Sequence, residues 1–120
     1  MKVVAVAAAV EVAAGVILAV IPSVAARLVF GVDFTPAGTA ICRIAGFGLF
    51  GLGIACWPVS TFVNLMAVRG LLAYNVLAAV LFAWLGISRE LVGPLLWPAA
   101  ALHGVLSLLL ARALFVSKTT

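Results

Sequence analysis

Each of the four long apolar stretches of this sequence carries one strongly polar side chain close to its middle: Glu11, Arg43, Asn75 and His103. Their chemistry is varied, because a carboxyl group and an imidazole exchange protons while an amide and a guanidinium form several hydrogen bonds. Placing an ionised residue at the centre of a bilayer costs roughly 2.5–3.5 kcal/mol. We therefore expect all four side chains to face the inside of a helical bundle and to pair there at one depth.

The stretches that carry these residues are long enough to cross a membrane. The chain has 120 residues, of which 68% are hydrophobic and 8% charged, whereas a soluble domain is about 45–50% apolar and about 25% charged. This composition excludes a water-soluble monomer, a disordered chain and a secreted disulfide scaffold. A span of about 20 residues crosses a hydrocarbon core of about 30 Å. The expected spans are residues 3–22, 36–57, 64–85 and 94–115.

The sequence predicts an all-α integral membrane protein, with residues 1–120 forming a single transmembrane domain folded as a four-helix up-down-up-down bundle. Strands are not expected, because the long Ala- and Leu-rich runs lack the alternation of a membrane barrel. Thr35 followed by Pro36 is a helix start, with a hydroxyl N-cap and proline at the first position. Pro22 ends or kinks the first span, and Ser23 is expected to cap a short interfacial turn that stops at Gly31.

Small residues surround the polar ones on the expected helices and allow close helix packing. Glu11 shares a helical face with Ala7, Ala8 and Gly15. We expect Glu11 to form an ion pair with Arg43, and Asn75 and His103 to complete the hydrogen bonding. Tyr74 points about 100° away from Asn75 on the same helix, so its participation stays open.

Two interpretations of this polar cluster remain open. It either locks the register of the helices or lines a site that binds a small molecule or moves a proton, and ionisable residues inside membranes favour the second. We therefore expect non-enzymatic handling of a small molecule or a proton, with a structural or accessory subunit of a larger membrane complex as the alternative. An enzyme that uses His103 or Glu11 as its acid–base group is less favoured, because the sequence offers no activated nucleophile.

The sequence predicts no cofactor and no metal site. His103 could be an axial ligand of a haem or a pigment, but it is the chain's single histidine, which excludes bis-histidine ligation within one chain. Cys42 and Cys56 lie 14 residues apart on one expected helix. That spacing corresponds to about 21 Å, so they cannot bridge each other.

The basic residues predict the orientation in the membrane. The side that holds both termini carries four of them and the other side two: Lys2, Arg69, Arg112 and Lys118 against Arg27 and Arg89. Because cytoplasmic segments carry an excess of Lys and Arg, we expect both termini in the cytoplasm. The basic residues form no clustered face, so nucleic-acid binding is not expected. The expected partners are the lipid bilayer and, through small-residue faces, further copies of the chain or a larger complex.

Two segments resemble each other and suggest an internal repeat. EVAAGVILA, starting at Glu11, aligns with NVLAAVLFA, starting at Asn75, and each is followed by a Leu-Val pair and a glycine. A true repeat would make the protein two related helical hairpins in parallel orientation.

Several segments resemble small four-helix bacterial membrane proteins of the DoxX-like kind. They are the Glu11 helix ending at Pro22, RIAGFGLFGLGIACWP from Arg43, RGLLAYN from Arg69 and LLWPAAALHGVL from Leu95. The resemblance implies a multi-pass protein of the bacterial inner (plasma) membrane, and it implies no activity, because that group has no agreed function. A lone acidic residue in the first span is also similar to the small multidrug resistance transporters, but their aromatic signature in the third span is missing.

Overall fold

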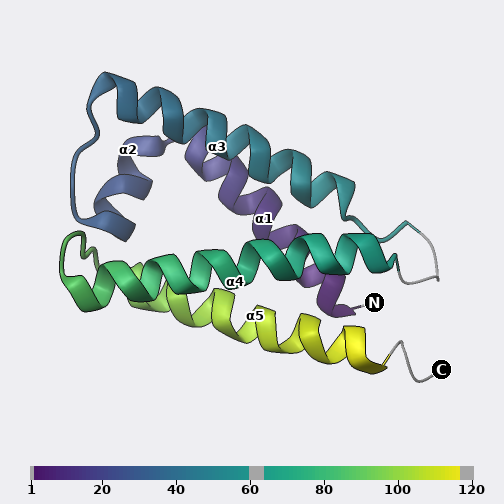
Figure 1. Cartoon of the computed structure of the whole chain (residues 1–120). Coiled ribbons are helices and arrows are strands. Elements are labelled where there is room, and N and C mark those ends of the chain that lie inside the picture. The colour runs from purple at the N-terminus through teal and green to yellow at the C-terminus, as the bar shows by residue number, and fades with distance from the viewer. Residues whose placement is uncertain (1, 60–63, 117–120) are drawn as a thin grey trace.

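Four long helices make up most of the computed structural model, which describes residues 2–59 and 64–116 (Figure 1). They are α1 (Lys2–Val20), α3 (Pro36–Ala55), α4 (Leu65–Ser88) and α5 (Leu96–Val116), and each is long and apolar enough to cross a membrane. Between α1 and α3 lie the short helix α2 (Pro22–Ala25) and the π-helix η1 (Ala26–Phe30). The all-α fold with four apolar helices is therefore confirmed.

The helices pack in pairs, α1 against α3 and α4 against α5. Helix α1 also contacts α4 and α5, so it joins the two pairs. In Figure 1 both described chain ends lie at one end of the molecule, which we call the terminal end, and α2 lies at the opposite end. We call that opposite end, which also holds η1 and the α4–α5 loop, the η1 end.

The long helices begin where the sequence gives start signals. The Thr35 hydroxyl accepts a hydrogen bond from the Gly38 backbone N–H at 3.1 Å, and Pro36 occupies the first helical position, as predicted. The Asn64 side chain caps α4 by accepting from the N–H groups of Met66 and Ala67 at 3.0 and 3.3 Å. These caps satisfy N–H groups that have no partner within their own helix.

The expected cap at Ser23 is wrong. The residue at the N-cap of α2 is Ile21, which makes no side-chain hydrogen bond there, and Pro22 occupies the first turn. Proline is favoured at the first helical position because its missing N–H would have no partner there. Pro22 therefore starts the interfacial segment and moves Ser23 inside it. The expected stop at Gly31 is correct, since this residue ends η1 in the left-handed conformation with φ 71°.

The α1–α3 contact depends on glycines that leave no room for a side chain. A Cβ at Gly46 would lie 2.7 Å from the backbone atoms Ala19 N and Gly15 O, and one at Gly53 would lie 2.7 Å from Ala8 O. Small residues allow helix backbones this close approach inside membranes. The contacts run in opposite directions along the two helices, so α1 and α3 are antiparallel and their register is fixed.

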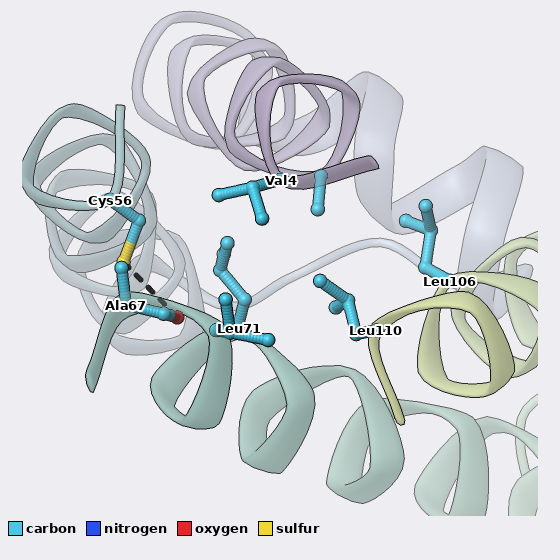
Figure 2. Close-up of a cluster of buried hydrophobic side chains, with 8 residues drawn as sticks. Val4, Cys56, Ala67, Leu71, Leu106 and Leu110 are labelled. Atoms are coloured by element: carbon cyan, nitrogen blue, oxygen red, sulfur yellow. Dashed lines mark hydrogen bonds between the residues drawn. The ribbon is translucent and has the colours of Figure 1, made fainter. Parts of the chain in front are cut away.

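Buried apolar side chains fill the terminal end of the bundle (Figure 2). The cluster joins α1, α4, α5 and the residue after α3, and it consists of Val4, Ala7, Cys56, Ala67, Val68, Leu71, Leu106 and Leu110. The Cys56 thiol donates a weak hydrogen bond to the Ala67 carbonyl at 3.8 Å.

Large apolar side chains also cover the outside of the bundle. On α4 the exposed residues Leu77, Val80, Trp84 and Ile87 recur at the spacing of one helical face. Asn75 of the same helix is completely buried. An apolar exterior around a polar interior indicates contact with a lipid bilayer, because a contiguous apolar surface of this kind is rare on soluble monomers.

Candidate functional site

Three of the four predicted polar residues meet in the interior of the bundle. Glu11 on α1 and Asn75 on α4 are completely buried, and His103 on α5 is 7% exposed. Each comes from a different helix, so the cluster joins the α1–α3 pair to the α4–α5 pair at mid-depth. The convergence of these three side chains follows from the cost of exposing polar groups to hydrocarbon.

Asn75 holds the cluster together through its amide. Its Nδ2 donates to Glu11 Oε1 at 3.0 Å and to the Leu71 carbonyl at 2.9 Å. The Asn75 Oδ1 lies 2.8 Å from His103 Nδ1. Because both Nδ2 hydrogens are donated to acceptors, Oδ1 accepts and His103 Nδ1 must carry a hydrogen. In the neutral imidazole the lone pair is then on Nε2, which faces away from Asn75.

The second oxygen of Glu11 has no partner. Among the buried side-chain oxygen and nitrogen atoms of the described residues, Glu11 Oε2 is the one that makes no hydrogen bond. A buried ionised carboxylate in that situation is costly, because nothing replaces its hydration. The arrangement can therefore bind a proton on Oε2, or accept a hydrogen bond there from a group that enters the site.

Aromatic rings line the cluster on the side of the η1 end. The His103 ring packs edge-on against Tyr74 with centroids 5.8 Å apart, and tilted against Phe82 at 5.5 Å. Phe82 contacts Phe30 at 6.3 Å, and Phe30 contacts Phe34 at 6.2 Å. Tyr74, whose participation the sequence left open, thus touches His103 through its ring.

Phe82 and Ser107 are site neighbours that the sequence analysis did not include among the candidate residues. Phe82 lies two turns after Asn75, and this i, i+7 spacing was the available signal. Ser107 lies one turn after His103 and donates from Oγ to the His103 carbonyl at 2.7 Å. This bond satisfies the Ser107 hydroxyl within α5, so it does not reach the imidazole.

The expected ion pair between Glu11 and Arg43 is not formed. Arg43 is exposed on α3, and the one ion pair within residues 2–59 and 64–116 joins Arg27 to Asp33. The register of α1 and α3 explains this result. Glu11 lies between Ala8 and Gly15, which contact Gly53 and Gly46, whereas Arg43 lies a turn beyond Gly46. Arg43 is thus about 10 Å from the depth of Glu11 along the helix axis.

The Arg27–Asp33 pair lies outside the spans, beside the end of η1. Both side chains are exposed, at 70% and 69%. The hydrogen bond to Asp33 and its negative charge raise the pKa of Arg27 above its usual value. Exposed pairs contribute little to stability, so this pair is not part of the site.

No metal-binding group is found in the described part of the chain. Within those residues no three His, Cys, Asp or Glu side chains are grouped closely enough to hold an ion. Cys42 and Cys56 are both free thiols and both buried.

No protein-family model, curated protein or solved structure matches this chain. The chain is therefore assigned to no family, and its candidate site is defined by geometry alone.

Proposed function

We propose that this chain is a small non-enzymatic membrane protein that binds and releases a proton at Glu11. The observation that carries the proposal is the completely buried Glu11 Oε2, which has no hydrogen-bond partner. In the protonated acid, Oε1 accepts from Asn75 and Oε2 carries the hydrogen. This neutral form avoids most of the desolvation cost of a buried carboxylate.

Release of the proton requires a change around Oε2. In the described contacts the Glu11 carboxylate would keep a single donor, the Asn75 amide. A buried charge needs further donors or a counter-ion, so water or another polar molecule has to reach Oε2 when the proton leaves. The site can therefore couple proton release to the entry of a small polar molecule.

Infrared spectroscopy of the protein in lipid vesicles tests this function, because a protonated carboxylic acid has its own carbonyl band. The band is expected at neutral pH, should decrease reversibly as the pH rises, and should be absent from Glu11→Gln. The matched control is Asp33→Asn, which removes an exposed carboxylate and should leave the band unchanged. A Glu11 band that persists at every pH at which the helices stay folded would contradict the proposal and favour a permanent structural lock.

An accessory role in a larger membrane complex is the second candidate, and the exposed Arg43 favours it. A guanidinium inside an apolar span is costly in contact with lipid chains, and the structure leaves Arg43 exposed on α3. A carboxylate on a neighbouring membrane protein would pair with it.

Native electrophoresis of membranes solubilised in mild detergent tests the accessory role. Arg43→Leu should reduce the size of the particle that contains this chain, whereas Arg69→Leu, an exposed arginine near the start of α4, should not. A particle of unchanged size in Arg43→Leu would remove this candidate.

A further inference from the structure

We infer that Arg69 and Arg112 together bind the phosphate of an anionic phospholipid in the membrane leaflet at the terminal end. This inference does not depend on proton binding at Glu11, because it concerns the outer surface of the α4–α5 pair. It assigns a specific lipid contact to two residues that have no part in the proposed function.

The terminal end of the bundle carries exposed basic side chains and no acidic ones. Lys2 begins α1, Arg69 lies in the first part of α4 and Arg112 in the last part of α5, and these helix ends meet at the terminal end (Figure 1). The acidic residues of the chain all lie elsewhere, in the polar cluster or at the η1 end: Glu11, Asp33 and Glu90. In the part of the chain that the structure describes, neither arginine forms an ion pair. An anion that pairs with them therefore comes from outside the chain.

The two arginines lie at similar depths, near the edge of the hydrocarbon core. Asn75 and His103 are side by side, because Asn75 Oδ1 lies 2.8 Å from His103 Nδ1. Arg69 is six residues before Asn75 and Arg112 is nine residues after His103. At about 1.5 Å per residue they lie about 9 and 13.5 Å from the polar cluster, a difference of less than one helical turn. Half of a hydrocarbon core is about 15 Å thick, so both side chains can reach the level of the phosphate groups.

Both arginines lie on the outer face of the α4–α5 pair. Arg69 is two residues from Leu71, and Arg112 is two residues from Leu110. Leu71 and Leu110 are completely buried in the apolar cluster between α1, α4 and α5 (Figure 2). Two residues correspond to a rotation of about 200° around a helix, so each arginine points away from this cluster and from α1. Because α4 and α5 pack against each other, the two guanidinium groups flank one lipid-facing surface.

An anionic phospholipid matches the chemistry of this surface. A guanidinium stays charged and donates parallel N–H bonds to phosphate oxygens. Towards mid-depth the surface becomes apolar, because the exposed Val76 lies two turns from Arg69 and the exposed Leu108 one turn from Arg112. The phosphate of one lipid can therefore contact both arginines while its acyl chains contact the apolar residues. A zwitterionic lipid fits less well, because no acidic side chain lies at this end to pair with its ammonium group.

Lys2 distinguishes a specific site from the general attraction between a basic protein surface and anionic lipid. It lies at the same end of the bundle and carries the same charge as each arginine. It is two residues from the buried Val4, so by the same rotation it points away from the apolar cluster. Because it belongs to α1, it lies outside the surface that Arg69 and Arg112 flank.

Native mass spectrometry of the protein released from lipid nanodiscs tests this site. The nanodiscs contain phosphatidylglycerol and phosphatidylcholine in equal amounts, and the lipids that stay bound to the protein are identified. The wild-type chain should retain phosphatidylglycerol in preference to phosphatidylcholine. Arg69→Gln and Arg112→Gln should each reduce this retention about fivefold, the effect of one basic residue near an anionic membrane surface. Lys2→Gln should retain phosphatidylglycerol as the wild-type chain does.

Three outcomes would overturn the inference, provided that circular dichroism shows intact helices in every variant. Equal losses in Arg69→Gln, Arg112→Gln and Lys2→Gln would mean that the terminal end attracts anionic lipid through its net charge alone. Wild-type retention of phosphatidylglycerol in the double variant of Arg69 and Arg112 would show that the arginines do not bind it. Equal retention of the two lipids by the wild-type chain would contradict the preference for an anionic head group.

Discussion

Asn75 is the residue on which the interior polar contacts depend. It is completely buried, and its amide contacts Glu11, Leu71 and His103. Replacing it with alanine would leave both Glu11 Oε1 and His103 Nδ1 without a partner in the interior. Buried groups left in that state destabilise a fold, and interhelical hydrogen bonds in membranes average about 0.6 kcal/mol with a maximum of about 1.7 kcal/mol.

We therefore predict that Asn75→Ala lowers the free energy of unfolding by about 1–2 kcal/mol. The measurement is reversible unfolding in mixed micelles with increasing denaturing detergent, followed by circular dichroism. Val76→Ala is the control, because Val76 is the next residue on α4 and its side chain is exposed. Equal unfolding midpoints for Asn75→Ala and Val76→Ala would show that the amide contributes no net stability.

The sequence correctly predicted that three polar residues meet inside the bundle, and it misplaced the fourth for a physical reason. Glu11, Asn75 and His103 followed from the cost of a polar group in an apolar span, and this cost acts on each helix separately. The position of Arg43 within its own span does not determine which residues of α1 lie beside it. That register depends on the contacts of Gly46 and Gly53 with the α1 backbone, which are tertiary contacts.

At the scale of elements, four glycines of α3 form two pairs that differ in whether they contact α1. Gly46 and Gly53 contact the α1 backbone, whereas Gly48 and Gly51 have no neighbouring atom within 4 Å of a Cβ position. The sequence shows all of them in one apolar helix and does not separate the two groups. The difference depends on which face of α3 meets α1.

We predict opposite effects for alanine on the two faces. Gly46→Ala would place Cβ 2.7 Å from backbone atoms of α1, and such overpacking costs about 1–3 kcal/mol. Gly48→Ala should be neutral or stabilising by up to about 1 kcal/mol, because alanine favours the helix more than glycine. Thermal denaturation of the two variants in detergent measures the difference. A Gly46→Ala variant as stable as Gly48→Ala would contradict the close α1–α3 contact.

In the segment between α1 and α3, the local sequence predicted a short turn but not its helical geometry or its long-range contacts. The short interfacial turn ending at Gly31 was predicted, but its π-helical geometry was not. Its carbonyls bind a distant loop, since the N–H groups of Gly93 and Leu95 donate to Val29 and Leu28 at 3.0 and 2.8 Å. These bonds join residues more than 60 positions apart, so no local residue pattern contains them.

Gly31 lies so close to the α4–α5 loop that a larger residue there should destabilise the junction between this loop and η1. The residue has φ 71°, and a Cβ there would lie 2.6 Å from the Val92 carbonyl oxygen. The left-handed conformation alone costs a residue with a Cβ about 1–2 kcal/mol. Gly31→Ala should therefore lower the unfolding midpoint more than Gly104→Ala, where no atom lies within 4 Å of the Cβ position. Comparable unfolding midpoints for the two variants would show that the close contact at Gly31 does not contribute to stability.

At the scale of the whole molecule, the two helix pairs meet through the segments that resemble each other in sequence. Glu11 and Asn75, which occupy equivalent places in the aligned segments, are hydrogen-bonded to each other. After the first segment, the Val29 carbonyl accepts a hydrogen bond from Gly93, the glycine after the second segment, and the Leu28 carbonyl accepts one from Leu95. A two-fold arrangement of related hairpins would bring equivalent residues together, so the Glu11–Asn75 contact agrees with the repeat hypothesis.

The predicted orientation of the molecule in the membrane rests on how the basic residues are distributed between the two ends of the bundle. Lys2, Arg69 and Arg112 belong to the terminal end of the bundle, and Arg27 and Arg89 to the η1 end. Asp33 and Glu90 lie near Arg27 and Arg89 in the sequence. These acidic residues have little influence on the prediction, because orientation depends on Lys and Arg rather than on net charge. The excess of basic residues is the basis of our prediction that the terminal end lies in the cytoplasm.

We predict that an impermeant maleimide added to intact cells labels Asp33→Cys at the η1 end, and labels Lys2→Cys at the terminal end after lysis. Asp33 is a suitable position because its side chain is exposed and lies outside the spans. Both variants are made with Cys42 and Cys56 replaced by alanine, so that the two buried thiols do not contribute. Labelling of Lys2→Cys in intact cells with protection of Asp33→Cys would contradict the predicted orientation and place the terminal end outside the cell.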